Sequence, residues 1–403
     1  MNIVIFGWVN YSYASPAASR LRTLAKGWID EGAKVHLLTT AKLKSDNDTE
    51  NGDCEFTIDG FSVESSYVSS IDSIASSRII LRMKSLLRGW QILKKLISQG
   101  KCDVLYLYAL SAIELYPASK IARNYGVPYF FDICEWAPRS SYNLWFINPW
   151  FYDNLFGMYL PGKHCSGVVA ITKYIAAKFC ESPFPVVVVP AINDFKNKDL
   201  ITDRIYRIRD SAFIVVYSGF CKPGDGVQHL LDAVRIVKRH GVPVKLIMLG
   251  ADGVVGYSLP FREMCERDME LRDLVQFKGV VPISEYYSIL CLADVLVLPR
   301  QYSQTNLAAF PTRLPEYLMT GRPVLISDVP DVSVYLKSDI HAKIVQSDSS
   351  EAIASGLIEL WGDQERACHI GMAGRERGAE VFDYRTYTKM IYKLFIDSIK
   401  KTS

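Results

Sequence analysis

The 403-residue sequence has no run of about 18 uncharged apolar residues, so we expect no segment to span a bilayer. It also has little excess of either charge. Its 46 Lys and Arg against 43 Asp and Glu argue against a protein that binds nucleic acid along a basic face. No G-x-G-x-x-G follows the apolar runs Ile3–Phe6 and Phe213–Ser218, which disfavours a dinucleotide oxidoreductase.

The nine cysteines include no C-x-x-C pair and no metal-like spacing. They lie in apolar stretches such as Leu290–Leu292, which is typical of buried thiols in a reducing compartment. The N-terminal segment Met1–Arg22 lacks the basic region that begins a signal peptide, and its apolar run is too short for secretion. We therefore expect a cytoplasmic protein.

The composition, 49% hydrophobic and 22% charged, is that of a globular protein, and the length favours two domains. Short β-branched runs alternate with amphipathic stretches, which indicates doubly wound, mostly parallel sheets in an α/β fold. The expected strands are Ile3–Phe6, Lys34–Thr39, Val104–Leu107, Val127–Phe131, Gly167–Ala170, Phe213–Ser218, Val244–Leu249, Val275–Lys278, Val295–Leu298 and Pro323–Ile326. The polar stretch Asn193–Asp210 separates the two series as a linker, so we expect two Rossmann-like domains facing a cleft.

The segment Ala308–Val324 is the most informative. Pro311 marks a helix start and Gly321 a helix stop. Backbone N–H groups at such a start can hold a diphosphate, and Glu316 just inside it can accept from the two hydroxyls of a ribose. The alternative is that Glu316 only favours the helix dipole. The residues at the start are Thr312, Arg313 and Leu314.

This segment resembles the donor-binding motif of nucleotide-sugar glycosyltransferases of the GT-B fold, in particular the family 4 group, which includes enzymes of bacterial surface polysaccharide synthesis. Further segments that resemble the family follow in the family's order: Phe131–Trp136, Val168–Lys173, Val216–Gly219 with Gly226 and Leu230–Ala233, Phe277–Val281 with Tyr286–Asp294, and Val295–Arg300. The resemblance implies an acceptor-binding domain over 1–192 and a nucleotide-sugar-binding domain over 193–383. It also implies a C-terminal helix, about 384–403, that packs back on the first domain, and donor contacts that include Gly219 and Val280.

The sequence departs from the family at three positions. The first of the family's two glutamates is replaced by Ala308, and its Arg and Lys on the diphosphate are replaced by Phe220 and Asp225. Other cations can neutralise the phosphates, because leaving-group stabilisation needs positive charge but no single position. The candidates are Lys222, Arg300 and Arg313. Lys222 can equally be a solvated loop lysine.

On the acceptor side, the loop after the first strand carries the small residues Gly7 and Ser15, which let a ligand approach the backbone. Asp132 and Glu135 follow the strand Val127–Phe131, where doubly wound sheets bind ligands. One of them can act as general base on an acceptor hydroxyl. The alternative is a helix cap for Asp132 and a solvated side chain for Glu135.

Two features concern partners. Seven basic residues and no acid lie between Asp72 and Asp103, interleaved with leucines and Trp90, and a basic amphipathic helix of this kind can lie on an anionic membrane. The stretch Trp145–Tyr159 concentrates aromatics, as suits an interfacial surface or an acceptor-lipid groove. The alternative for both is ordinary packing within the domain.

The preferred hypothesis is a metal-independent, cofactor-free GT-B glycosyltransferase acting on a saccharide or lipid-linked saccharide, peripheral at the inner face of a membrane. The D-x-D at Asp46–Asp48 lies in a polar run and is interpreted as a loop, not a metal site. Two alternatives remain: a sugar-nucleotide epimerase of the same fold, and a catalytically weakened subunit that only binds substrate.

Overall fold

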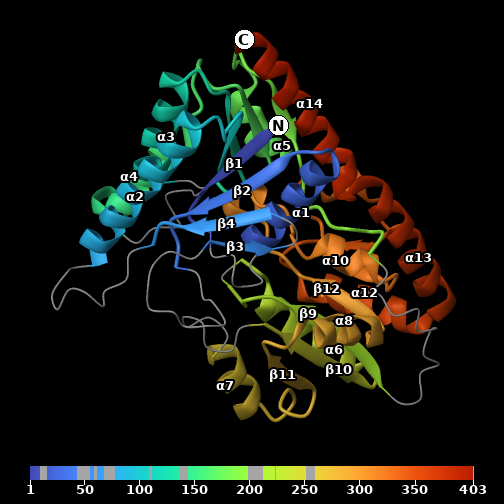
Figure 1. Cartoon of the computed structure of the whole chain (residues 1–403). Coiled ribbons are helices and arrows are strands. Elements are labelled where there is room, and N and C mark those ends of the chain that lie inside the picture. The colour runs from blue at the N-terminus through green and yellow to red at the C-terminus, as the bar shows by residue number, and fades with distance from the viewer. Residues whose placement is uncertain are drawn as a thin grey trace. The chain divides into compact units, whose positions relative to one another are not determined.

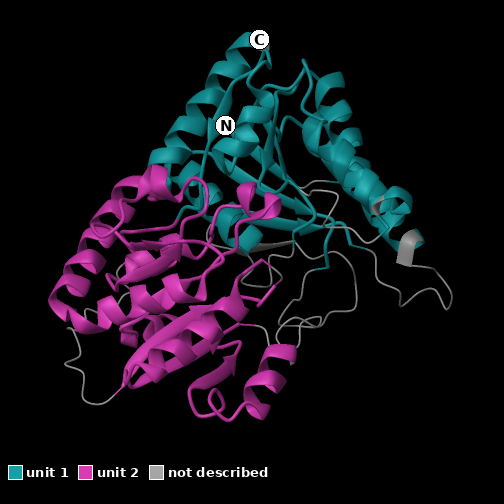
Figure 2. Ribbon diagram, turned by 180° about the vertical axis from the view of Figure 1, so that it is seen from behind, with its two compact units in different colours: residues 1–192, 384–403 teal, residues 193–383 magenta. Residues whose placement is uncertain are grey.

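The computed structural model describes residues 1–9, 16–42, 55–58, 61–67, 78–108, 111–136, 144–197, 212–222, 224–250 and 259–402. The chain divides into two compact units. Unit 1 comprises residues 1–192 with 384–403, and unit 2 comprises residues 193–383 (Figure 2). Ser15, the D-x-D and most of the expected linker lie outside the described residues.

Unit 1 is built on an eight-stranded sheet of order β3-β4-β2-β1-β5-β6-β7-β8, parallel throughout except for the β3–β4 pair (Figure 1). Its strands are β1 (Asn2–Gly7), β2 (Lys34–Thr39), β3 (Glu55–Ile58), β4 (Phe61–Ser65), β5 (Val104–Tyr108), β6 (Tyr129–Ile133), β7 (Gly167–Ala170) and β8 (Val186–Val188). Its helices are α1 (Pro16–Asp30), α2 (Arg78–Ser98), α3 (Ala112–Asn124), η2 (Trp145–Ile147), α4 (Pro149–Met158), α5 (Lys173–Ala176), η3 (Ala177–Phe179) and α14 (Tyr384–Thr402).

Unit 2 has a six-stranded parallel sheet of order β11-β10-β9-β12-β13-β14. Its strands are β9 (Phe213–Ser218), β10 (Val244–Leu249), β11 (Val275–Gly279), β12 (Val295–Leu298), β13 (Val324–Ser327) and β14 (Lys343–Val345). Its helices are α6 (Val227–Arg239), α7 (Leu259–Arg267), α8 (Ile283–Leu292), α9 (Gln304–Leu307), α10 (Leu314–Met319), α11 (Val332–Tyr335), α12 (Ser350–Gly362) and α13 (Gln364–Val381). The two doubly wound parallel sheets predicted from the sequence are confirmed.

The central strands of each sheet are covered on both faces, which explains their continuous apolar runs. All four residues of β12 are buried, as are Ile3 to Phe6 of β1. Ile3 and Ile5 pack in the core formed with α1 and α14, whereas Phe6 lies beside Gly89 of α2. A strand packed on both faces keeps no side chain for solvent, so the polar chemistry lies at strand ends.

The C-terminal helix α14 completes the core of unit 1. Phe395 is fully buried, with its ring centroid 5.1 Å from that of Trp28 and 4.8 Å from that of Phe130. At the start of the helix, the Tyr384 hydroxyl donates to Asp30 of α1 at 2.7 Å. The last residues of the chain thus stabilise the first unit.

We predict that Phe395→Ala destabilises the protein by about 3–5 kcal/mol, because it leaves a cavity among buried aromatic rings. The neighbouring substitution Ile396→Ala is the matched control, since Ile396 is 37% exposed, and it should cost less than about 1 kcal/mol. Urea unfolding followed by circular dichroism measures both. Equal losses in the two variants would contradict the docking of α14 through Phe395.

Candidate functional site

The predicted donor-side positions come together at one edge of the unit 2 sheet. Gly219 follows β9, Val280 follows β11 and Arg300 lies just beyond β12. These strands are parallel within one sheet, so their carboxyl ends share an edge (Figure 1). Helix α10, which carries Glu316, follows β12 and leads into β13. In open α/β sheets, this edge is where ligands bind.

Glu316 is held by two neighbours. Its Oε2 atom lies 2.9 Å from the Arg313 guanidinium and accepts a 2.8 Å hydrogen bond from the Tyr286 hydroxyl of α8. The Arg313 and Glu316 side chains are 25% and 17% exposed, so the group is accessible without being loosely solvated. Burial and then the Glu316 carboxylate raise the pKa of Tyr286, which keeps the phenol protonated as a donor.

Helix α10 is fastened to the end of β9. The backbone N–H of Ser218 donates to the Tyr317 hydroxyl at 2.7 Å. At the helix start, the Leu314 N–H donates to the Pro311 carbonyl at 3.0 Å, so this one of the three expected diphosphate donors already has an internal partner. Thr312 and Arg313 are half-buried at the same start.

The loop between β9 and α6 is shaped by its glycines and by Asp225. Gly226 has φ +70°, and a Cβ there would lie 1.6 Å from the Pro299 carbonyl oxygen, so only glycine fits. Asp225 accepts from the Lys222 backbone N–H at 2.9 Å and from the Tyr217 hydroxyl at 3.3 Å. The Lys222 side chain is exposed, with its ammonium 5.6 Å from the Phe220 ring centre.

Arg300 and Asn306 join this loop to the one after β12. The Arg300 guanidinium donates to the Ala309 carbonyl at 3.2 Å and to the Asn306 side-chain oxygen. The Asn306 amide in turn donates to the carbonyls of Gly224 at 2.9 Å and Gln301 at 2.8 Å. Burial lowers the pKa of Arg300, and its Nε is a buried donor that has no partner in the described part of the chain.

Two of the other donor-side positions differ sharply in exposure. Val280 is 77% exposed beyond the end of β11, where Gly279 has φ +70°. Ala308, at the position of the family's first glutamate, is fully buried. A carboxylate at position 308 would therefore be desolvated.

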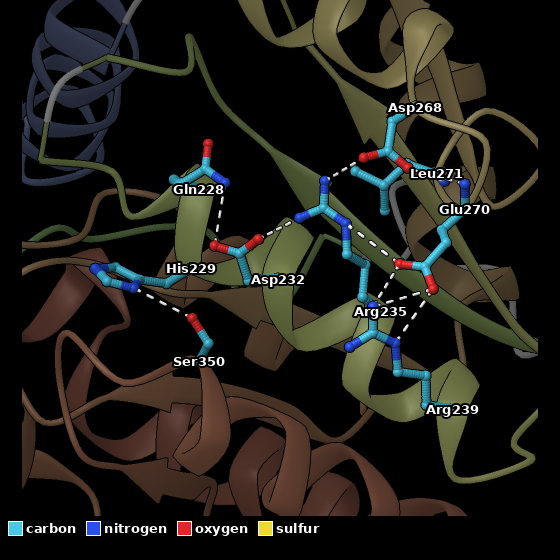
Figure 3. Close-up of polar contacts among 9 residues, drawn as sticks. All are labelled: Gln228, His229, Asp232, Arg235, Arg239, Asp268, Glu270, Leu271 and Ser350. Carbon is cyan, nitrogen blue, oxygen red and sulfur yellow. Dashed lines mark hydrogen bonds and ion pairs between the residues drawn. The ribbon is translucent and has the colours of Figure 1, made fainter.

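A charged network holds α6 in place behind these loops (Figure 3). Arg235 pairs with Asp232 on the same helix and with Asp268 beyond α7, and the hydrogen bond from Arg235 lowers the pKa of Asp268. Nearer the start of α6, His229 Nδ1 lies 3.3 Å from the Ser350 hydroxyl of α12. Most of these groups are exposed or half-buried, so the network fixes the helix and is no candidate site.

In unit 1, the two candidate carboxylates have different surroundings. The Asp132 side chain is fully buried and forms a bidentate pair with Arg20 of α1, at 2.9 and 3.0 Å. Arg20 also donates to the carbonyls of Val189 and Pro190. Burial alone would lower the pKa of Arg20, but the Asp132 carboxylate raises it. Glu135 is exposed. Asp132 therefore has a structural partner that the sequence did not indicate, and its role as general base stays a prediction.

Gly7, the described member of the acceptor-side pair, lies against the neighbouring strand. A Cβ at this position would be 1.8 Å from the Tyr108 carbonyl oxygen. Glycine is thus required for the approach of β1 to β5, whether or not a ligand also binds there.

Sequence reasoning missed three residues that shape these sites: Arg20, Tyr286 and Asn306. The sequence analysis included Tyr286 only within the segment Tyr286–Asp294, and nothing in the pattern indicated a role for its hydroxyl. Asn306 had one signal, an amide in a loop that also carries Arg300. Arg20 is an arginine on the buried face of α1, and such a residue needs a partner.

Residues 201–377, most of unit 2, match the family described as glycosyl transferases, group 1. Unit 2 is therefore similar to the group 1 glycosyl transferases. No curated protein matches the chain by sequence.

Several solved structures share the fold of the whole chain. HepE of Anabaena, in complex with UDP and glucose, is 14% identical with a TM-score of 0.70 over 98% of this chain and 100% of that one. Sucrose-phosphate synthase of Thermosynechococcus elongatus is 14% identical with a TM-score of 0.72, covering 98% and 99%. The catalytic domain of starch synthase IV of Arabidopsis thaliana, bound to ADP and acarbose, is 11% identical with a TM-score of 0.66, covering 99% of each. The resemblance to the GT-B glycosyltransferases is confirmed, whereas membership of the family 4 group stays a prediction.

We predict that Asp132→Asn destabilises the protein by about 3–5 kcal/mol, because it leaves the Arg20 charge buried without its partner. The exposed neighbour Glu135→Gln should change the free energy of unfolding by less than about 0.5 kcal/mol. Urea unfolding of both variants decides. Wild-type stability in Asp132→Asn would show that the ion pair contributes nothing to the fold.

Proposed function

We propose that the protein transfers a sugar from a nucleotide-diphosphate donor to a saccharide or lipid-linked saccharide in the synthesis of a polysaccharide or glycoconjugate. One observation carries the proposal: the carboxyl edge of the unit 2 sheet holds a carboxylate, Glu316, oriented by Arg313 and Tyr286. HepE, which shares the fold, was solved with UDP-glucose. The donor sugar and base, and the stereochemical outcome, are left open.

In this proposal Glu316 binds the ribose. Both of its contacts engage Oε2, so within the described part of the chain Oε1 is available to a hydroxyl pair. Arg313 and Tyr286 fix the carboxylate before the nucleotide arrives, which reduces the entropy lost on binding. Thr312, Arg313 and Leu314 then lie on the phosphate side, and Gly219 and Val280 flank the nucleotide.

In this proposal Arg300 and Lys222 neutralise the negative charge of the diphosphate. Asp225 occupies the position where the family carries a lysine, so the β9–α6 loop is less positive than the family pattern implies. Arg300 is already oriented by Asn306, and among the described residues its buried Nε donor has no partner. A donor that is fixed in advance stabilises a developing phosphate charge more than a freely solvated one.

On the acceptor side, the exposed Glu135 is the better candidate for general base, and Asp132 acts through the Arg20 pair as a positioning residue. Gly7 and Ser15 stay the proposed acceptor-side loop. We place the reaction at the inner face of a membrane, with segment 78–101 facing anionic lipid. No helix among the described residues is long and apolar enough to cross a bilayer.

Two measurements test the function. Thermal-shift screening of the purified protein against nucleoside diphosphates identifies the base, and incubation with UDP-, GDP- and dTDP-sugars reports turnover. Slow release of free sugar supports a transferase, a changed nucleotide sugar supports the epimerase alternative, and binding without turnover supports a substrate-binding subunit.

We predict that Glu316→Gln weakens binding of the preferred nucleoside diphosphate by about 1.5–3 kcal/mol, because a charge-assisted hydrogen bond to the ribose is lost. Tyr286→Phe should weaken it by about 0.5–1.5 kcal/mol, because the carboxylate is less firmly oriented. Isothermal titration calorimetry gives both values.

The matched control for the Glu316 variant is Glu351→Gln, which alters a first-turn glutamate of another unit 2 helix, α12. It should leave nucleotide affinity unchanged. Wild-type affinity in a folded Glu316→Gln protein would remove Glu316 from the nucleotide site.

We also predict that turnover does not require a divalent metal, because the proposed diphosphate ligands are backbone N–H groups and cationic side chains. Turnover should be the same in EDTA as in magnesium or manganese. Activity that EDTA abolishes and manganese restores would overturn this part of the proposal.

A further inference from the structure

Exposed apolar side chains are concentrated on one part of unit 1. More than half of the large hydrophobic residues that are exposed among the described ranges lie between Ile80 and Tyr159, about a fifth of the chain. Scattered exposed hydrophobics are ordinary, but a contiguous apolar patch marks an interaction site. The elements concerned are α2, α3 and α4, which lie together in Figure 1 with α3 against both α2 and α4, and η2, which directly precedes α4 in the chain.

Helix α2 presents a divided stripe to solvent. In its first half the exposed positions are mostly apolar, with Ile80, Met83 and Leu87 at 49%, 39% and 50% exposure and spaced as neighbours on one helix face. In its second half the same stripe carries Lys94 and Lys95. Helix α2 buries Leu86 and Leu93 on its opposite face. Ile80, Met83 and Leu87 are therefore not used in packing the helix onto its sheet.

Helix α4 and the turn before it present aromatics. Phe146 and Ile147 of η2 are 57% and 65% exposed, and Trp150, Phe156 and Tyr159 are 48%, 62% and 62% exposed. Aromatic side chains with one apolar and one polar end favour the boundary between water and lipid.

Side-chain contacts join these helices into one surface. The Arg82 guanidinium of α2 stacks 4.6 Å above the Trp150 ring of α4. The Asp153 carboxylate of α4 accepts from the Ser111 hydroxyl and from the Ile113 N–H at the start of α3, at 2.7 and 2.8 Å. We name the exposed side chains of α2, η2 and α4 the α2–α4 surface.

The charges on these elements have one sign. The only acids in α2, α3, η2 and α4 are Glu114 and Asp153, and both are buried. The exposed charged side chains described there are all lysines or arginines. An anionic lipid bilayer accepts exposed apolar side chains and cations together, which matches this surface.

We infer that the α2–α4 surface inserts into the interface of an anionic membrane, with Phe146, Ile147 and Phe156 entering the headgroup boundary and Lys84, Lys94 and Lys95 contacting acidic headgroups. This deepens the proposed peripheral location and does not depend on the transfer reaction. It assigns membrane contact to α4 and η2 as well as to the basic helix.

The experiment is sedimentation of the full chain with vesicles of phosphatidylcholine alone or containing phosphatidylglycerol. Wild-type protein should partition onto the anionic vesicles and less as salt is raised. Each basic residue near an anionic bilayer raises the partition coefficient about fivefold. The triple variant Lys84→Glu, Lys94→Glu and Lys95→Glu should therefore lower partitioning by about 100-fold. Phe146→Ser with Phe156→Ser should lower it by about tenfold or more at every salt concentration.

Matched controls use exposed residues of unit 2. Lys238→Glu with Lys245→Glu and Lys337→Glu makes the same charge change, and Met269→Ser with Ile340→Ser removes equally exposed apolar side chains. Neither set should alter partitioning. Nucleotide binding in the α2–α4 variants should equal that of wild type, which separates this test from that of the donor site.

Two outcomes overturn the inference. If wild-type protein stays in the supernatant with anionic vesicles at low salt, the α2–α4 surface does not bind a membrane. A concentration-dependent dimer in sedimentation velocity, abolished by Phe146→Ser with Phe156→Ser, would assign the surface to a second copy of the chain instead.

Discussion

Both units depend on parallel sheets whose central strands are buried on both faces. Such strands have few side chains left for chemistry, so the polar groups that could meet a substrate lie mainly where strands end and loops begin. In unit 2 two of those loops are joined by short contacts, as when Gly226 lies against the Pro299 carbonyl and the Asn306 amide donates to Gly224. The loops after β9 and β12 are thus linked to one another rather than independent.

These links bear on the departures from the family pattern. Ala308 removes a negative charge, whereas Phe220 and Asp225 remove two positive charges and Asp225 adds a negative one. The donor side is therefore less positive than the family pattern implies. Arg300 is a cation of the adjacent loop, and its guanidinium donates to the Asn306 side-chain oxygen. In the proposed function this fixed cation replaces part of the missing positive charge.

The sequence predicted what depends on neighbouring residues and missed what depends on distant ones. Val295–Leu298 is recognisable as a buried strand because four consecutive apolar residues need two covering layers. The Arg20–Asp132 pair joins positions 112 residues apart, and no local pattern encodes it. The edge strand β3, Glu55–Ile58, has no run of consecutive apolar residues that would mark it as a buried strand, and its antiparallel pairing with β4 is likewise not encoded in a local pattern.

The chain uses positive charge in two physical settings. Arg300 is half-buried with its Nε enclosed, and salt screens such a charge less than one at the surface. The lysines of the α2–α4 surface stand in water, where the Debye length is about 8 Å at physiological salt and their attraction is correspondingly weak. An overall charge of +3 conceals both. Salt therefore distinguishes the two roles: it should release the protein from lipid well before it disturbs the binding of a diphosphate at Arg300.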